Sequence, residues 1–196
     1  VYEKDLQKTM EIVPDETMVI SPLDHRTSRL AEKYPNFIQA PTHRKYQYSA
    51  LVNWLKNDLK EDEPVLFIYE ENARDTAAIR EMTQALDSSG IQYTKFSYPI
   101  LKGRGIASSI FAKMNRTGNN RVIIDSEGEA WVTDLVRNLS ILRRRTKITL
   151  YSPSKIRTYD AIDIETLYST LLHLCMSYNI NYDAAAVKDF LLKYRA

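Results

Sequence analysis

The sequence predicts an α/β fold in which a doubly wound parallel β-sheet carries helices on both faces. From residue 64 onward, short apolar segments typical of strands alternate about five times with segments of helical periodicity. The strand segments are continuous apolar runs, as expected for strands that are buried on both faces of a parallel sheet. This alternation favours right-handed crossovers between neighbouring parallel strands.

The elements can be assigned in order along the chain. The first strand is expected at residues 64–69 and the first helix at 76–86, after which Gly90 marks a turn. In the last helix, Phe190 and Tyr194 share an apolar face, so this helix is expected to dock on another surface. The elements between them are predicted as strands at 93–98, 121–125, 147–151 and 171–176, and as helices at 106–114, 131–142, 162–167 and, last, 187–194.

Residues 1–63 fit this alternation less well. A strand is expected at 17–20 and a helix at 47–59, but the turn-rich stretch between them carries little periodicity. The side chains of this helix that are expected to face inward are Leu51, Trp54 and Leu55.

A charged segment that ends in a proline, residues 60–64, suggests a crossing between two units. We therefore divide the chain into two parts. Residues 1–63 form the remnant of a first unit together with the crossing, and residues 64–196 form a Rossmann-like second unit.

The composition is that of an ordinary globular chain. The 196 residues include 27 basic and 25 acidic side chains, and a formal net charge of +2 does not favour a nucleic-acid partner. The basic run at residues 143–145 follows a predicted helix, where positive charge complements the helix dipole, and it is expected to be solvated. A single cysteine, Cys175, excludes an internal disulfide and a zinc site built from cysteines. No apolar stretch approaches the roughly 20 residues of a membrane span.

Polar residues follow the predicted strands where ligands bind in open parallel sheets, outside the carboxyl ends. Carboxylates there can face an ammonium group, and hydroxyls or helix amides can face a carboxylate, so this edge suits a zwitterion. Asp75 and Ser126 are also explained as helix caps, because each lies just before a predicted helix. The candidate residues of the second unit are Glu71, Asp75, Ser126, Glu127, Glu129 and Ser154.

Catalytic and metal-binding patterns are scarce. The three histidines, His25, His43 and His173, are far apart and show no helical i, i+4 pair for a metal. The sequence contains neither a Gly-x-Ser-x-Gly elbow nor a phosphate-binding loop, and residues 103–108 lack the third glycine of a dinucleotide fingerprint. We therefore expect no enzyme activity, no metal and no cofactor.

Several segments resemble a known family. "MVISPLDHRT" and "NFIQAPT" resemble first-lobe strands, and "VLFIYEENARDTAAIREMTQAL" resembles the start of the second lobe, of type I periplasmic binding proteins. The final strand and helix, with Phe190 and Tyr194, resemble the end of that lobe. "ILKGRGIASSIFAKM" and "NNRVIIDSEGEAWVTDLVRNL" are more similar to a Bacteroidetes branch of substrate-binding proteins for amino-acid ABC transporters, whose members often carry peptidoglycan-binding LysM repeats upstream.

The resemblance implies the second lobe of a type I periplasmic-binding-protein-like fold plus part of the first lobe, so the chain is expected to be a fragment. Residues 1–46 would then lack their usual sheet partners. We expect them to pack irregularly on the second lobe or against another copy, because exposed strand edges tend to be covered. A homodimer through this truncated first-lobe region is one expected arrangement.

The resemblance also implies a non-catalytic ligand-binding or sensor module, with a small molecule, an amino acid or a cell-wall fragment, held between two lobes. Ser21, Asp24 and Thr27 would line the first-lobe side. Leu23 and His25 are bulkier than the residues usual at this turn, which leaves open a cell-envelope scaffold or protein-interaction module with a vestigial cleft. The implied partners are a membrane transporter or another envelope protein, without nucleic acid, and the implied location is the periplasm or cell envelope.

Overall fold

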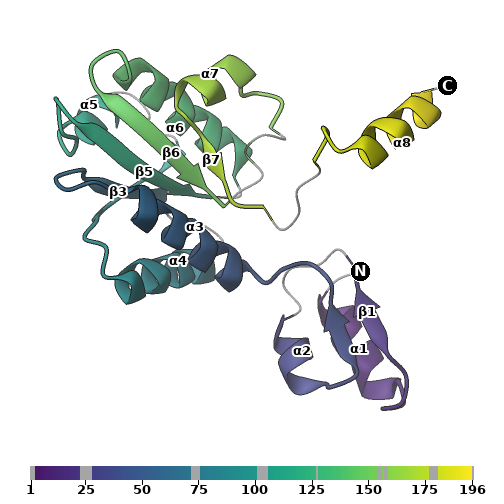
Figure 1. Cartoon of the computed structure of the whole chain (residues 1–196). Coiled ribbons are helices and arrows are strands. Elements are labelled where there is room, and N and C mark those ends of the chain that lie inside the picture. The colour runs from purple at the N-terminus through teal and green to yellow at the C-terminus, as the bar shows by residue number, and fades with distance from the viewer. Residues whose placement is uncertain are drawn as a thin grey trace.

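The chain folds around a five-stranded parallel sheet, as predicted (Figure 1). The structure, a computed structural model, describes residues 3–22, 28–71, 76–100, 106–126, 128–153, 156, 159–176 and 181–195. The strands lie in the order β4-β3-β5-β6-β7. Their bounds are β3 Val65–Glu70, β4 Thr94–Tyr98, β5 Asn119–Asp125, β6 Lys147–Ser152 and β7 His173–Leu174.

Helices cover both faces of this sheet, which confirms the doubly wound fold. Successive side chains of β5 point to opposite faces of the sheet. Val122 and Ile124 belong to the hydrophobic core on one face, and Ile123 belongs to the core on the other. The apolar runs predicted as strands are therefore buried from both sides. One face is covered by α3 Arg44–Asp58 and α4 Thr76–Ser89, the other by α5 Ile106–Phe111, α6 Glu129–Leu142 and α7 Ile164–Ser169.

The inward face of α3 differs from the prediction at one residue. Leu51 and Leu55 are buried against β3 and β5 as expected, but Trp54 is 45% exposed. Trp54 lies at the border of the buried face, and its ring packs 4.5 Å from that of His173 on β7. Periodicity alone did not distinguish a core position from a position at the margin of the sheet.

Residues 3–39 form a small unit of regular elements. Their order is α1 Glu3–Ile12, β1 Val19–Ser21, α2 Ser28–Lys33 and β2 Phe37–Gln39. β1 and β2 pair in parallel, and Met10, Leu30 and Phe37 form a separate small core. The expectation that residues 1–46 pack irregularly was therefore wrong, because α1 and α2 pack their apolar side chains against these short strands. The division of the chain at residue 63 stays a prediction.

The chain ends in α8 Ala185–Arg195, which lies apart from the five-stranded sheet (Figure 1). Phe190 and Tyr194 stack on each other with ring centroids 6.0 Å apart, and both remain exposed. The surface that this helix was expected to dock on therefore stays a prediction. None of the described helices combines the length and the apolar character that a membrane span requires.

A buried charge network ties α3 to the beginning of β5. The Arg121 guanidinium donates to the Glu63 carboxylate at 2.8 Å and to the Asp58 carboxylate, and Nη1 also donates to the Tyr151 hydroxyl at 2.7 Å. The Tyr151 hydroxyl in turn donates to Asp58 at 2.8 Å. A charge buried in this way is tolerated because its donors are satisfied.

We predict a large difference between two aliphatic residues of α6 that are two positions apart. Leu139 is fully buried in the core, whereas Ile141 is 61% exposed. Leu139→Ala should lower the free energy of unfolding by about 2–5 kcal/mol, because it leaves a cavity. Ile141→Ala should change it by less than about 0.5 kcal/mol. Urea unfolding of both variants measures the difference, and equal effects would contradict the described position of α6.

We also predict that acid weakens the network around Arg121. Burial opposes ionisation of Glu63, but the Lys60 N–H and the Arg121 guanidinium together hold the pKa of the Glu63 carboxyl below its usual value. A carboxyl with a lowered folded-state pKa stabilises the fold above its unfolded pKa, about 4.3 for Glu. This contribution is lost as the pH falls through the folded-state pKa.

The free energy of unfolding should therefore fall below about pH 5 in the wild type, and less steeply in Glu63→Gln. Glu61→Gln serves as the matched control, since Glu61 is exposed in the same loop. Urea unfolding at a series of pH values measures the slopes. Equal slopes in the wild type and Glu63→Gln would contradict the role of Glu63.

Candidate functional site

The order of the strands reverses between β3 and β5, so the ends of these two strands form a topological switch point. After β3 the chain forms β4 on one side, then crosses back so that β5 pairs with the opposite side of β3. The connections from β3 and β5 therefore leave their carboxyl ends in opposite directions. Ligands of open α/β sheets bind at such a switch point.

The Glu70 carboxylate is held at this switch point by Ser126, which Gly128 holds in turn. The Ser126 hydroxyl, just after β5, donates to Glu70 Oε2 at the end of β3, with a distance of 2.7 Å. The Gly128 N–H donates to Ser126 Oγ at 2.9 Å. A Cβ atom at Gly128 would lie 2.8 Å from Glu70 Oε2, so any other residue there would require the carboxylate to move. Within the described chain, Glu70 Oε1 accepts no hydrogen bond and remains available.

The carboxylate of Glu70 also lies at the beginning of α6, a helix of 14 residues. The N-cap of this helix, Gly128, has no side chain that could bond the free N–H groups of the first turn. The positive end of the helix dipole therefore lies beside the Glu70 carboxylate. The same helix end can attract an anionic group of a ligand.

A second carboxylate, that of Asp125, ends β5 on the opposite face of the sheet. The Tyr48 hydroxyl, from α3, donates to Asp125 Oδ2 at 2.7 Å. Burial, together with the negative charge of Asp125, raises the pKa of Tyr48 far above its ordinary value, so the phenol stays protonated and donates. Glu70 and Asp125 thus lie at the switch point on the two opposite faces of the sheet.

Tyr98, at the end of β4, is buried beside the end of β3, at the edge of the sheet where the strands end. Its hydroxyl donates to Asp134 Oδ2 at 3.0 Å, and its carbonyl accepts from Trp131 Nε1 at 3.0 Å and from the Glu71 N–H at 3.1 Å. Burial raises the pKa of Tyr98 well above its ordinary value, and the Asp134 carboxylate adds to this effect. Tyr98 is therefore a structural residue of the edge.

Three of the predicted site residues lie at this edge of the sheet. Ser126 is buried and bonded to Glu70, whereas Glu71 follows β3 and Glu129 begins α6, both exposed. Ser21 is buried at the end of β1 in the small unit, where its carbonyl accepts from the Ala40 N–H at 2.9 Å. The remaining predicted site residues, which lie outside the described residues, are Asp24, Thr27, Asp75, Glu127 and Ser154. A ligand-binding role for each of the nine stays a prediction.

Several residues of the described edge were missing from the predicted set, among them Glu70, which directly precedes the predicted Glu71. Asp125 was assigned to the predicted strand and was not considered as a site residue. An acidic residue at the end of an apolar strand can indicate a site at that strand end. Tyr48 has no such signal, because it precedes Asp125 by 77 positions and meets it only in the fold. Gly128 could have been noticed as a glycine three positions before the predicted helix 131–142.

The described histidines have structural partners. His43 caps α3, since its Nδ1 accepts from the Lys45 N–H at 3.0 Å, and His173 packs against Trp54 and Tyr151. Neither lies at the switch point. Within the described part of the chain, no three His, Cys, Asp or Glu side chains are grouped so that they could hold a metal ion.

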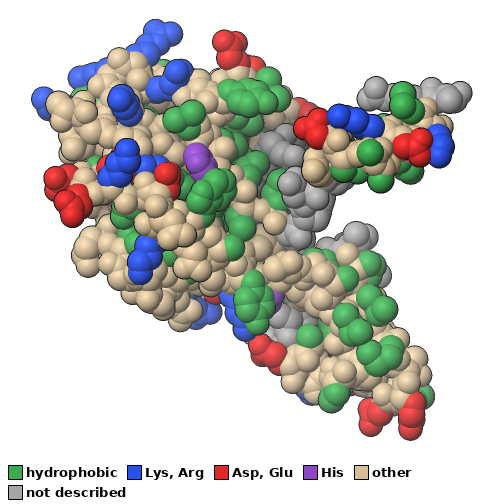
Figure 2. Space-filling view, viewed as in Figure 1, with side chains coloured by type: hydrophobic (Ala, Val, Ile, Leu, Met, Phe, Trp, Pro, Cys, Tyr) green, Lys and Arg blue, Asp and Glu red, His purple; other side chains and the backbone are tan. Residues whose placement is uncertain are grey.

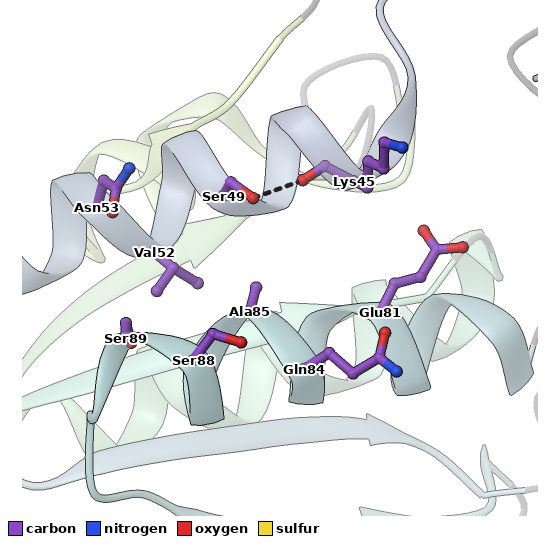
Figure 3. A pocket seen from close by; sticks show the side chains of 9 residues that line it. All are labelled: Lys45, Ser49, Val52, Asn53, Glu81, Gln84, Ala85, Ser88 and Ser89. Carbon is purple, nitrogen blue, oxygen red and sulfur yellow. Dashed lines mark hydrogen bonds between the residues drawn. The ribbon is translucent and has the colours of Figure 1, made fainter.

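A groove of about 390 Å³ lies between α3 and α4 (Figure 3). Val52 and Ala85 face each other across it, and Ser49 bonds the Lys45 carbonyl of its own helix at 2.9 Å. The other lining side chains are polar: Lys45, Asn53, Glu81, Gln84, Ser88 and Ser89. Short side chains on two packed helices explain this groove, so the switch point remains the stronger candidate site.

Comparisons with known proteins support the fold. No protein-family model and no curated protein matches the chain. The chain is similar to the crystal structure of an extracellular ligand-binding receptor from Verminephrobacter eiseniae EF01-2, with a TM-score of 0.63 and 10% sequence identity. The match covers 98% of this chain and 54% of the receptor, so the chain spans about half of the receptor's length. The chain therefore has a periplasmic-binding-protein-like fold.

We predict that the hydrogen bond between Tyr48 and Asp125 stabilises the edge of the sheet where the strands end, which we call the carboxyl edge. Tyr48→Phe should lower the free energy of unfolding by about 1.5–3 kcal/mol, because it removes a buried donor to a charged group. Tyr46→Phe is the matched control on the same helix, since Tyr46 is 61% exposed. Denaturant unfolding measures both. An unchanged stability of Tyr48→Phe would contradict the described bond.

Proposed function

We propose that this chain is part of a non-catalytic ligand-binding protein whose small-molecule ligand binds at the switch point between β3 and β5. One observation carries the proposal: Glu70 is fixed by Ser126 through Oε2, while Oε1 has no partner within the described chain. A rigid carboxylate with a free acceptor oxygen is suited to bind a cationic group.

The position of the small unit supports a ligand that is enclosed from two sides. In Figure 1, the unit formed by residues 3–39 joins the start of α3, on the side of the sheet where the strands end. A ligand at the switch point would therefore lie between two parts of the chain. In this arrangement Ser21, Asp24 and Thr27 contribute from the small unit.

Binding without catalysis fits the side chains present. The Ser126 hydroxyl donates to a carboxylate, and the two described histidines are engaged elsewhere, so the described edge holds no serine activated by a histidine base. We assign the edge to recognition and expect no chemical change in the ligand.

An amino acid is the ligand class that this edge suits best. Glu70 and Asp125 would face its ammonium group, and the beginning of α6 would face its carboxylate. A cell-wall fragment that carries a free amino acid end offers the same groups. Such a ligand suits a protein in the periplasm or cell envelope that works with a membrane transporter, and LysM repeats elsewhere in the full protein would fit a wall fragment.

Exposed apolar side chains favour one alternative function, a cell-envelope scaffold that binds other proteins or a second copy. Ile20 and Ile38 lie side by side on the uncovered face of β1 and β2, and α8 exposes Phe190 and Tyr194. Uncovered apolar groups of this kind are typical of interaction surfaces. The two functions differ in whether the switch point binds a small molecule.

A thermal-shift screen of the full chain against amino acids and muropeptides tests the proposal. A ligand at 100 times its dissociation constant stabilises by about 2.7 kcal/mol, which raises the melting temperature by several degrees. Glu70→Gln should weaken binding about tenfold or more, because it removes a charge-assisted bond. Gly128→Ala should weaken it too, since the new Cβ displaces the Glu70 carboxylate.

Glu61→Gln is the control, because it removes one exposed carboxylate at the opposite edge of the same sheet. It should bind as the wild type does. If no compound shifts the melting temperature, or if a compound shifts Glu70→Gln and the wild type equally, binding at the switch point is wrong. A shift in every variant alike would indicate a site elsewhere.

A further inference from the structure

The edge of the sheet where the strands begin carries a cluster of basic side chains. They come from three segments: the end of α5 and the loop after it, the turn after α6, and the first residue of β6. We call this cluster the basic edge. Its residues are Lys113, Arg116, Arg143, Arg144, Arg145 and Lys147, all exposed. Figure 2 shows Lys and Arg side chains gathered at the upper left of the molecule, where these segments lie.

A buried polar network holds these segments together. Asn120, which is fully buried at the start of β5, donates to the Asn115 carbonyl at 2.9 Å, to Thr146 Oγ1 at 2.9 Å and to the Lys147 carbonyl at 3.1 Å. Thr146 Oγ1 in turn donates to the Asn115 carbonyl at 2.7 Å. The charged segments are therefore fixed relative to one another, so they form one surface.

The cations of the basic edge are not neutralised within the described chain. None of the six takes part in an ion pair there; the ion pairs of that part of the chain involve other basic residues. The guanidinium of Arg145 lies 4.1 Å from the centre of the Phe111 ring, and that of Arg116 lies 5.8 Å from it. Six like charges that are held together and form no ion pair within the described chain favour an anionic partner.

An exposed aliphatic side chain lies beside these charges. Ile141 is 61% exposed in the last turn of α6, directly before the basic turn, and Arg137 is exposed one turn earlier on the same helix. An apolar group beside cations suits the boundary between lipid headgroups and acyl chains. Nucleic acid fits less well, because Arg116 and Arg145 already cover the ring of Phe111 on which a base could stack.

The basic edge is remote from the switch point. β5 connects the two, and its seven residues span roughly 20 Å. The carboxyl edge carries described acids, among them Glu70, Glu71 and Asp125. Acids also lie before β3 at the edge where the strands begin: Asp58 and Glu63 pair with Arg121, and Glu61 and Asp62 are exposed. A partner on the basic edge would leave the switch point free.

We propose that the basic edge binds a membrane surface that contains anionic phospholipids, with Ile141 inserting among the headgroups. This surface orients the strand ends, and with them the switch point, away from the membrane. The contact is peripheral and electrostatic, so it is reversible and weakened by salt.

Co-sedimentation of the full chain with vesicles tests this proposal. The chain should bind phosphatidylcholine vesicles that contain about a third phosphatidylglycerol, and it should not bind pure phosphatidylcholine vesicles. Binding should be lost in about 1 M salt, where the screening length is about 3 Å. Replacing Arg143 and Arg144 by Glu should weaken binding about a hundredfold or more. Ile141→Ser should weaken it by a smaller factor, and salt should affect this variant as it does the wild type.

The control variant combines Lys8→Glu with Arg80→Glu, which changes the net charge equally at exposed positions outside the basic edge. It should retain most of the binding. The proposal is wrong if the wild type does not bind the anionic vesicles, or if the control loses as much affinity as Arg143→Glu with Arg144→Glu. Binding to duplex DNA at the same salt, without binding to vesicles, would identify a nucleic-acid surface instead.

Discussion

The position of β5 between β3 and β6 is the constraint on which the rest of the structure depends. Its hydrogen bonds to β3 require the chain to cross back past β3, which creates the reversal of strand order. Its alternation directs Arg121 and Asp125 toward α3, while Val122 and Ile124 pack toward α6. A shift of one residue in register would turn Arg121 and Asp125 to the other face, away from their partners Asp58 and Tyr48.

The sheet could be predicted from the sequence because its strands are buried on both faces. Continuous apolar runs of this kind identify each strand locally, and β3, β5 and β6 were assigned to within about two residues. The strands of the small unit have three residues each and weak patterns, so β2 was expected from resemblance alone. The two helices beside them were not expected, although α1 carries Leu6 and Met10 at helical spacing on the face that enters the small core.

The candidate site could be predicted only in part, for a related reason. The candidate site lies at strand ends, and Ser126 and Glu71, which were named from the sequence, do lie at the reversal of the sheet. Which groups meet there depends on long-range pairing. Glu70 and Ser126 are 56 positions apart and form one bond only because β3 and β5 are neighbours. No local pattern indicates that Gly128 must lack a Cβ for the carboxylate to fit beside it.

The two edges of the sheet, which β5 connects, hold polar groups in different ways. This difference distinguishes polar groups that stabilise the fold from a polar group that can bind another molecule. At the start of the strand, Asn120 and Arg121 are buried and bonded to several partners, so they fix the segments around them. At the carboxyl edge, Glu70, the last residue of the neighbouring strand β3, is bonded through one oxygen only and lies beside the first turn of α6, which has no side-chain cap. A group that is satisfied on every side stabilises a fold, whereas a fixed group with one free acceptor can bind another molecule. The carboxyl edge is therefore the part of this fold where recognition can occur without loss of stability.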